Sequence, residues 1–141
     1  MPVYATNDDY AAWTGTAAPA NIAPYLRKAS NQVREATELD YYAVDNNGLP
    51  TDAAKLQAFN DATCCQAAAL IALGVDPLAG GAVVASVKES KSIGTARITF
   101  ATTDAQAAAA AKKRAAEGLV PDALLILRQA RLAKNAVWVI G

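Results

Sequence analysis

The side chains that could carry out chemistry are few, and they do not combine into a catalytic set. The chain has 141 residues and contains no histidine. This excludes the Ser-His-Asp and Cys-His nucleophile arrangements and every metal site that uses histidine. The sequence also has no GxGxxG motif and no phosphate-binding loop ending in Gly-Lys-Ser/Thr. We therefore expect a protein that is not an enzyme and that binds no cofactor.

Two shorter patterns also fail as metal or redox sites. The turn Asp45-Asn46-Asn47-Gly48 is similar to part of a calcium loop, but positions 43 and 54, where the pattern needs acidic residues, are both alanine. Cys64 and Cys65 are adjacent in a helical pattern, where their side chains point about 100° apart and cannot form a disulfide. We interpret them as small core or interface residues in a reducing compartment.

The charged residues leave two interpretations open. Lys112-Lys113-Arg114 is the one dense basic cluster, and it is either a solvated helix face or a phosphate-facing patch. The net charge of zero argues against non-specific nucleic-acid binding as the main activity. Residues 1–61 carry four basic and eight acidic side chains, and the remainder carries nine basic and five acidic. This asymmetry is either ordinary scatter or an acidic face of one subunit that meets a basic face of the next.

The elements that must position these residues are mainly helical. The longest helical pattern runs from Thr51, an N-cap, to Gly74, a stop signal. It has one bulky face and one face of small residues, which predicts a buried central helix. Its expected core residues are Leu56, Phe59, Leu70 and Leu73. The small residues that we expect at a contact between subunits are Ala58, Ala62, Cys65 and Ala69.

Shorter helical patterns lie on both sides of this central helix. We expect a helix from Thr6 to Trp13, opened by a Thr6–Asp9 capping box, and a second helix from Asn21 to Glu38. Thr103 begins a helix to Glu117 through five consecutive alanines, and Pro121 begins a last helix to about Leu132. The core residues expected from the second and last helices are Leu26, Val33, Leu124 and Leu127. Tyr41 and Tyr42 are expected to cover the end of the core.

Two stretches depart from the helical pattern. Apolar residues alternate within residues 82–101, which predicts a β-hairpin-like excursion with a polar tip. Residues 134–141 form an extended, β-prone C-terminal tail. The predicted fold is therefore mainly α: a single domain over residues 1–133, with about four main helices, a short N-terminal helix, the excursion and the tail. The sequence has no signal-peptide start and no 18-residue uncharged apolar run, so we expect a soluble protein.

The order of these segments resembles the head-to-tail adaptor (head completion or connector) proteins of long-tailed bacteriophages and gene transfer agents. The resemblance covers most of the chain and lies in helical layout and spacing. It rests on YATNDDYAAWTG, LRKASNQVREAT, VDNNGLPTD leading into LQAFNDATCCQAAALIALGVDPL, the SIG of residues 92–94, and LVPDALLILRQARL.

The resemblance implies a structural virion protein that is made in the host cytoplasm. A ring of about twelve copies, built by one contact repeated by rotation, would lie beneath the portal protein. It would extend the DNA channel and connect the capsid to the tail or to a tail-side connector (stopper). Genomic DNA would pass through without sequence-specific binding, and no membrane is implied.

Two segments are assigned to contacts within such a particle. Lys88, Glu89 and Lys91, at the tip of the excursion, would face the channel or the next ring. In the tail, Trp138 would anchor the chain to the portal as an added strand, or the tail would instead fold back onto its own helices. The tail residues assigned to the portal are Val137, Trp138, Val139 and Ile140.

A different class of function competes with this one. A helical DNA-binding regulator or small DNA-packaging subunit would need a recognition helix with several basic or amide side chains on one face. Only Lys112, Lys113 and Arg114 offer such a face.

Overall fold

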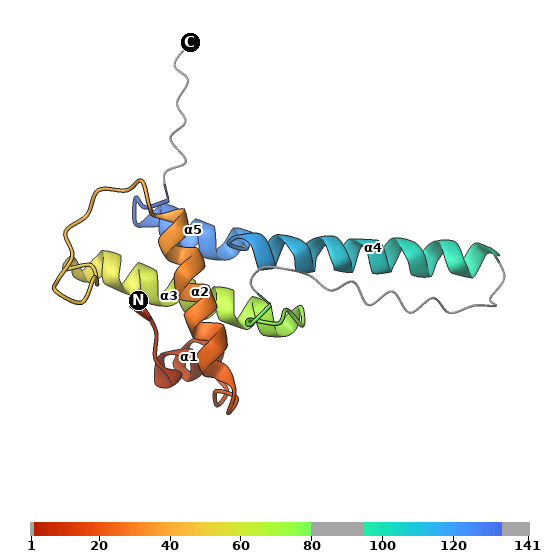
Figure 1. Ribbon diagram of the computed structural model, residues 1–141, viewed down its shortest axis with the longest axis horizontal. Coiled ribbons are helices and arrows are strands. Elements are labelled where there is room, and N and C mark those ends of the chain that lie inside the picture. The colour runs from red at the N-terminus through yellow and green to blue at the C-terminus, as the bar shows by residue number, and fades with distance from the viewer. Residues whose placement is uncertain (1, 80–94, 134–141) are drawn as a thin grey trace, which may run out of the picture.

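The computed structural model describes residues 2–79 and 95–133 of the chain. These residues form α1 (Asn7–Thr14), α2 (Ile22–Ala36), α3 (Ala53–Ala72), α4 (Thr95–Glu117) and α5 (Pro121–Gln129), shown in Figure 1. Within the described ranges the only β pairing is an isolated bridge between Val44 and Pro50. The predicted class, mainly α, is confirmed.

The central helix predicted from the sequence is α3, which contacts the other four helices. It begins one residue later than expected, because Asp52 rather than Thr51 is the N-cap, and the Asp52 side chain accepts a hydrogen bond from the Ala54 N–H. The helix stops before Gly74, as predicted: Leu73 is the C-cap, and the φ of Gly74, 68°, is left-handed. The Gly74 N–H donates to Ile71 and the Val75 N–H to Leu70, which satisfies the last carbonyl groups of the helix.

Two apolar clusters lie along α3. The first joins α1, α2, the second half of α3 and the end of α4, and it includes Leu26, Ala67, Leu70 and Ala116. The second joins the first half of α3 to α5 and the N-terminal segment. Its centre is Phe59, with the Tyr4 and Tyr42 rings edge-on at centroid distances of 4.8 and 5.2 Å. Five predicted core residues are buried: Leu26, Val33, Phe59, Leu70 and Leu127.

Some predicted core positions lie at the edge of the fold. Leu56 is 37% exposed, so its assignment to the core is wrong. Leu56 lies in the first turn of α3, which is largely exposed. Leu73 and Leu124 are half-buried and pack against the two clusters. Tyr41 is fully exposed, so Tyr42 alone of the tyrosine pair covers the core.

The excursion prediction is wrong over residues 95–101, which belong to α4. A strand in this position would need a partner to satisfy its backbone, whereas a helix bonds its own. The alanine-rich segment that follows has high helix propensity, so the helix continues backwards through Thr103, which is interior and not a cap. The rest of the excursion, with Lys88, Glu89 and Lys91, lies outside the described residues.

The start of α1 follows the sequence prediction. The Thr6 side chain accepts from the Asp9 N–H at 3.2 Å, and the Asp9 carboxylate accepts from the Thr6 N–H at 2.8 Å. Mainly because of this Thr6 N–H, the pKa of Asp9 is lowered from its ordinary value of 3.8. Gly15 ends the helix with a φ of 74°. None of the helices in the described parts of the chain is long and apolar enough to cross a membrane.

Replacing Phe59 with alanine should lower the free energy of unfolding by about 3–5 kcal/mol, because it leaves a cavity beneath two tyrosine rings. The measurement is denaturant unfolding. Leu56→Ala, three residues earlier on the same helix, is the matched control and should cost much less because Leu56 is partly exposed. Equal losses in the two variants would contradict the assignment of Phe59 as the centre of the cluster.

The capping box predicts a pH dependence of stability. Because the pKa of Asp9 is lowered in the folded state, its contribution is present above pH 3.8 and is lost as the pH falls through the folded pKa. Asp9→Asn should remove this part of the acid sensitivity of the thermal midpoint. Asp8→Asn, in the same turn but outside the capping box, is the matched control. Identical acid profiles for Asp9→Asn and the parent protein would refute the prediction.

Candidate functional site

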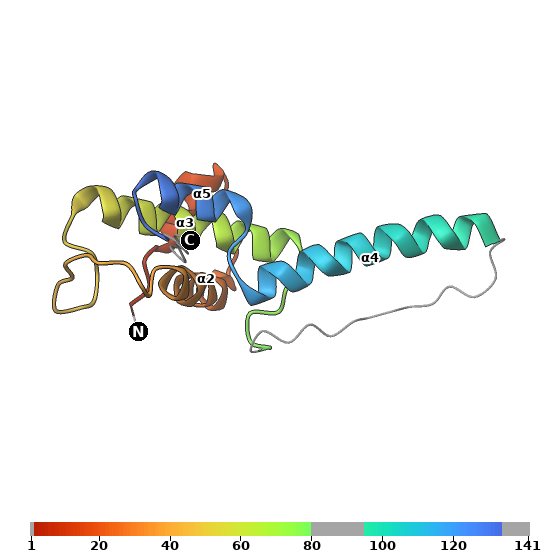
Figure 2. The same ribbon diagram turned by 90° about the horizontal axis from the view of Figure 1, so that it is seen from above.

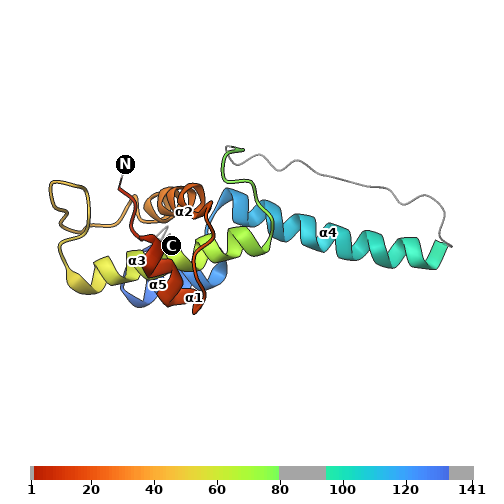
Figure 3. The same ribbon diagram turned by 90° about the horizontal axis from the view of Figure 1, so that it is seen from below.

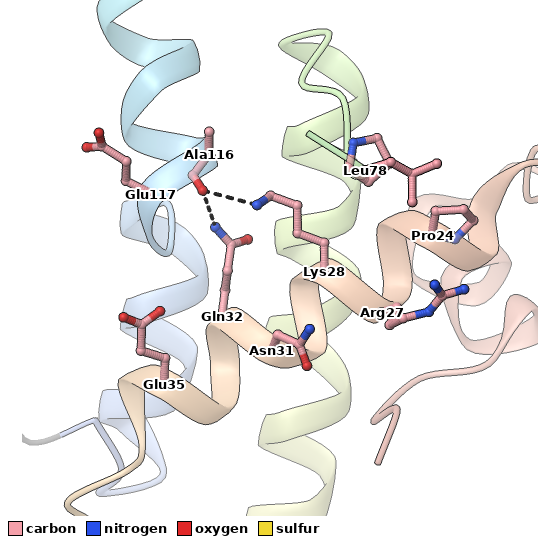
Figure 4. A pocket seen from close by; sticks show the side chains of 10 residues that line it. Pro24, Arg27, Lys28, Asn31, Gln32, Glu35, Leu78, Ala116 and Glu117 are labelled. Atoms are coloured by element: carbon pink, nitrogen blue, oxygen red, sulfur yellow. Dashed lines mark hydrogen bonds between the residues drawn. The ribbon is translucent and has the colours of Figure 1, made fainter. Parts of the chain in front are cut away.

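A polar groove lies where α2 passes the last turn of α4, as Figure 4 shows. Its volume is about 540 Å³. One wall is α2, the second is the segment that follows α3, and the third is the end of α4. The lining residues are Pro24, Arg27, Lys28, Asn31, Gln32 and Glu35 from α2, then Pro77, Leu78, Ala116 and Glu117.

The side chains that line this polar groove are suited to binding a partner. Its described side chains include the cations Arg27 and Lys28 and the carboxylates Glu35 and Glu117, but no serine, cysteine or histidine. At the rim, Leu78 is 73% exposed. A surface with both signs of charge and an exposed leucine can pair with a partner of matching pattern, and charges of this kind fix orientation more than they add affinity.

Beneath the groove, two buried glutamines hold the end of α4. The Gln32 amide donates to the Ala115 carbonyl oxygen at 2.8 Å, and the Gln66 amide donates to the same oxygen at 3.1 Å. The two side chains also bond each other, Gln66 Nε2 to Gln32 Oε1 at 2.9 Å. We call this pair, which comes from α2 and α3, the glutamine clasp.

The glutamine clasp also fixes the turn between α4 and α5. Gln66 donates to the Gly118 carbonyl oxygen at 3.1 Å and accepts from the Val120 N–H at 2.8 Å. From the solvent side, Lys28 Nζ donates to the Ala116 carbonyl oxygen at 3.1 Å, as drawn in Figure 4. The last carbonyl groups of a helix lack internal partners and carry partial negative charge, so amide and ammonium donors are suited to them.

Sequence reasoning missed the glutamine clasp, although a signal was present. Gln66 interrupts an apolar run between Cys65 and Ala67, and Gln32 sits beside Val33 on the inward side of α2. A polar residue at a core-facing position needs a buried partner. For that reason both glutamines could have been predicted to form buried hydrogen bonds. The carbonyl groups that they bind could not have been predicted from the sequence.

Beyond the clasp, α4 is an arm that projects from the body of the fold, as the three views in Figures 1, 2 and 3 agree. Its buried residues among those with described side chains are Ala115 and Ala116, at the base. Residues 105–110 are all exposed. The basic cluster is on this arm, where Lys113 and Arg114 are exposed and Lys113 lies 3.9 Å from Glu117. Lys112 is half-buried, and the exposure of the other two side chains fits both a solvated helix face and a phosphate-facing patch.

The predicted subunit contact on α3 needs correction. Ala58 and Ala62 are buried within the subunit, in the cluster with Ala123 and Leu127. Their small side chains allow α5 to approach α3 closely, so a neighbouring subunit has no access to them. Cys65 packs against the same cluster and is half-buried, as is Ala69. The tail residues assigned to the portal, Val137, Trp138, Val139 and Ile140, lie outside the described residues.

The other candidate residues have structural roles. Asp45 Oδ1 accepts from the N–H groups of Asn47 and Leu49, which builds the turn at Gly48. The described residues contain no group of side chains that could hold a metal ion. Burial raises the pKa of the Cys64 thiol to about 12, and the Asp9 and Asp61 carboxylates add to the shift. That thiol stays protonated at neutral pH and is a poor nucleophile.

Replacing Gln66 with leucine should cost about 1–3 kcal/mol for each buried group that it leaves unpaired, among them the Val120 N–H. Denaturant unfolding measures the loss, and hydrogen exchange at Val120 should become faster. Gln57→Leu is the matched control, because Gln57 is an exposed glutamine on the same helix that bonds Asp61. A Gln66→Leu protein as stable as the control would show that the clasp is dispensable.

The comparisons with known proteins do not identify the chain. No protein-family model, curated protein or solved structure matches it.

Proposed function

We propose that this protein is a structural adaptor of a phage-like particle, which assembles into a ring beneath the portal and connects the capsid to the tail. The observation that carries the proposal is the projecting arm, α4, which leaves the body of the subunit and, among its described side chains, buries only Ala115 and Ala116 at the base. The segment order that resembles head-to-tail adaptors supports the same function.

The arm is suited to contact another subunit. Residues 105–110 are exposed on every side of the helix, and all of them except Gln106 are alanine. Alanine keeps the arm helical without packing, and its small side chain allows another backbone to approach closely. Among the described residues, no other element of the subunit covers this surface. In a closed ring, an arm of this kind would reach the next subunit by the same contact at every position.

The polar groove at the base of the arm is a second surface for assembly. A ring contact is heterologous, so it pairs two different surfaces of the same chain. The groove offers Arg27, Lys28, Glu35 and Glu117 around an opening, and these charges could set the register of a neighbouring subunit. We assign the arm and the groove to the ring in place of Ala58 and Ala62.

The partners in this proposal are a portal protein on the capsid side and a stopper or tail protein on the other side. Genomic DNA passes through the ring without base recognition, because tight phosphate contacts would hinder its movement. The excursion residues 88–91 would face the channel or the next ring. The tail residues 137–140 would bind the portal. The protein would then be part of the virion.

Ala109→Arg should prevent ring assembly without changing the stability of the subunit. Arginine keeps a high helix propensity, but its bulk blocks close approach at the middle of the arm. Electron microscopy of portal-bearing heads mixed with purified protein measures assembly, and denaturant unfolding checks the subunit. Ala12→Arg, at an exposed alanine of α1, is the matched control and should assemble normally.

Three results would argue against the adaptor proposal. Ala109→Arg protein that still forms rings would exclude the arm as the contact. Failure of the parent protein to bind any portal-bearing head would exclude the adaptor role itself. A salt-dependent gel shift with duplex DNA, abolished by neutralising Lys112, Lys113 and Arg114, would favour the DNA-binding regulator instead.

A further inference from the structure

A second groove lies where the loop after α2 meets the start of α3 and the end of α5. Its volume is about 600 Å³, which is within the range of pockets that bind small ligands or a few side chains. We call it the C-terminal groove. It is lined by Leu39, Asp40, Tyr41, Asp52, Ala54, Lys55, Ala130 and Arg131.

Two large side chains of this groove are left in water. Leu39 is 88% exposed and Tyr41 is fully exposed, whereas the neighbouring Tyr42 packs on Phe59. An exposed leucine and tyrosine beside a recess are typical of a surface that another segment covers, since aromatic residues dominate the centres of such contacts. Ala54 and Ala130 add small side chains to the lining, which leaves room for a bulky one to enter.

The chain leaves the described fold at this same groove. After α5, Arg131 adopts a left-handed φ of 63°, and the Leu132 N–H bonds back to the Leu127 carbonyl oxygen at 2.8 Å. Leu132 and Ala133 are buried. The Ala133 N–H then donates to the carboxylate of Asp40, which lines the groove. The residue that precedes the tail is therefore fixed to the groove wall.

We propose that the C-terminal groove holds residues 134–141 of the same chain in the free subunit, with Trp138 against Leu39 and Tyr41. The segment contains Val137, Trp138, Val139 and Ile140 in succession, and these side chains gain by leaving water. Trp138 is five residue steps beyond Ala133, which span at most about 18 Å when the chain is extended. The tryptophan can therefore reach a groove whose lining residue Asp40 binds the Ala133 N–H.

The same chain is favoured over another copy as the occupant for two physical reasons. A segment joined to its site by a short linker has an effective concentration in the millimolar range, far above that of a second copy in dilute solution. An extended segment also needs partners for its backbone carbonyl groups, and Lys55 and Arg131 are donors in the groove lining. This inference stands on the groove and on the exit of the chain, so it does not depend on the adaptor function.

If the protein is an adaptor, a tail held in the groove would also regulate assembly. The tail residues assigned to the portal would be covered in the free subunit, and a portal would have to compete with the groove for them. The groove would thereby keep the apolar tail from binding other molecules before the subunit meets a portal.

Tryptophan fluorescence tests the proposal directly. The chain has two tryptophans, so Trp13→Phe leaves Trp138 as the single probe. In this background we expect blue-shifted emission and weak quenching by acrylamide. Combining Leu39→Ser with Tyr41→Ser should shift the emission to the red and raise the quenching constant severalfold, while the far-UV circular dichroism of the helices stays unchanged, because neither side chain belongs to the two apolar clusters. Leu78→Ser, at an exposed leucine of the polar groove, is the matched control and should change nothing.

Other outcomes would overturn the proposal. These are water-like emission of Trp138 in the Trp13→Phe protein, or emission that the double variant leaves unchanged. Emission that shifts to the red on dilution would assign the groove to the tail of a second copy. As a measurement that needs no groove variant, deletion of residues 135–141 should speed hydrogen exchange in residues 39–41 and 52–55, and unchanged exchange there would also overturn it.

Discussion

The glutamine clasp is the interaction on which the arrangement of the helices depends. Gln32 and Gln66 approach from α2 and α3, bond each other, and together satisfy backbone groups at the end of α4 and in the turn before α5. Both side chains are buried, so each lost bond would leave a polar group without water. Four helices therefore meet at one hydrogen-bonded point. Apolar contacts alone, which are not directional, would fix their angles less strictly.

The clasp decides what the subunit presents to others. Because side chains from α2 and α3 hold Ala115 and Ala116 at the base, the direction of α4 is set there, whereas residues 105–110 farther along the arm are exposed. The arm and the polar groove then have a fixed relation to each other. The proposed ring would need this, since a small error in one contact accumulates around a closed assembly. The C-terminal groove lies at the far end of α5, where the chain leaves the fold.

Much of the helical framework followed from the sequence because its signals are local. The Thr6–Asp9 capping box, the stop at Gly74 and the start of α5 at Pro121 each depend on residues within one turn. The periodic stripe of α2 identified Leu26 and Val33 as buried because helical spacing alone puts them on one face. The lack of histidine likewise excludes whole classes of chemistry through composition alone.

Tertiary structure decided which apolar and polar residues found partners. Helical spacing predicted both Leu56 and Phe59 to be core residues, but only Phe59 is buried. The small face of α3, with Ala62, met α5 of its own chain and not another subunit. Residues 95–101 belong to α4, although their alternating pattern had predicted a strand. Gln66 donates to the carbonyl oxygens of Ala115 and Gly118, which are far from it in the sequence. A sequence pattern defines the faces of an element, whereas the neighbour that covers each face depends on how all the elements pack together.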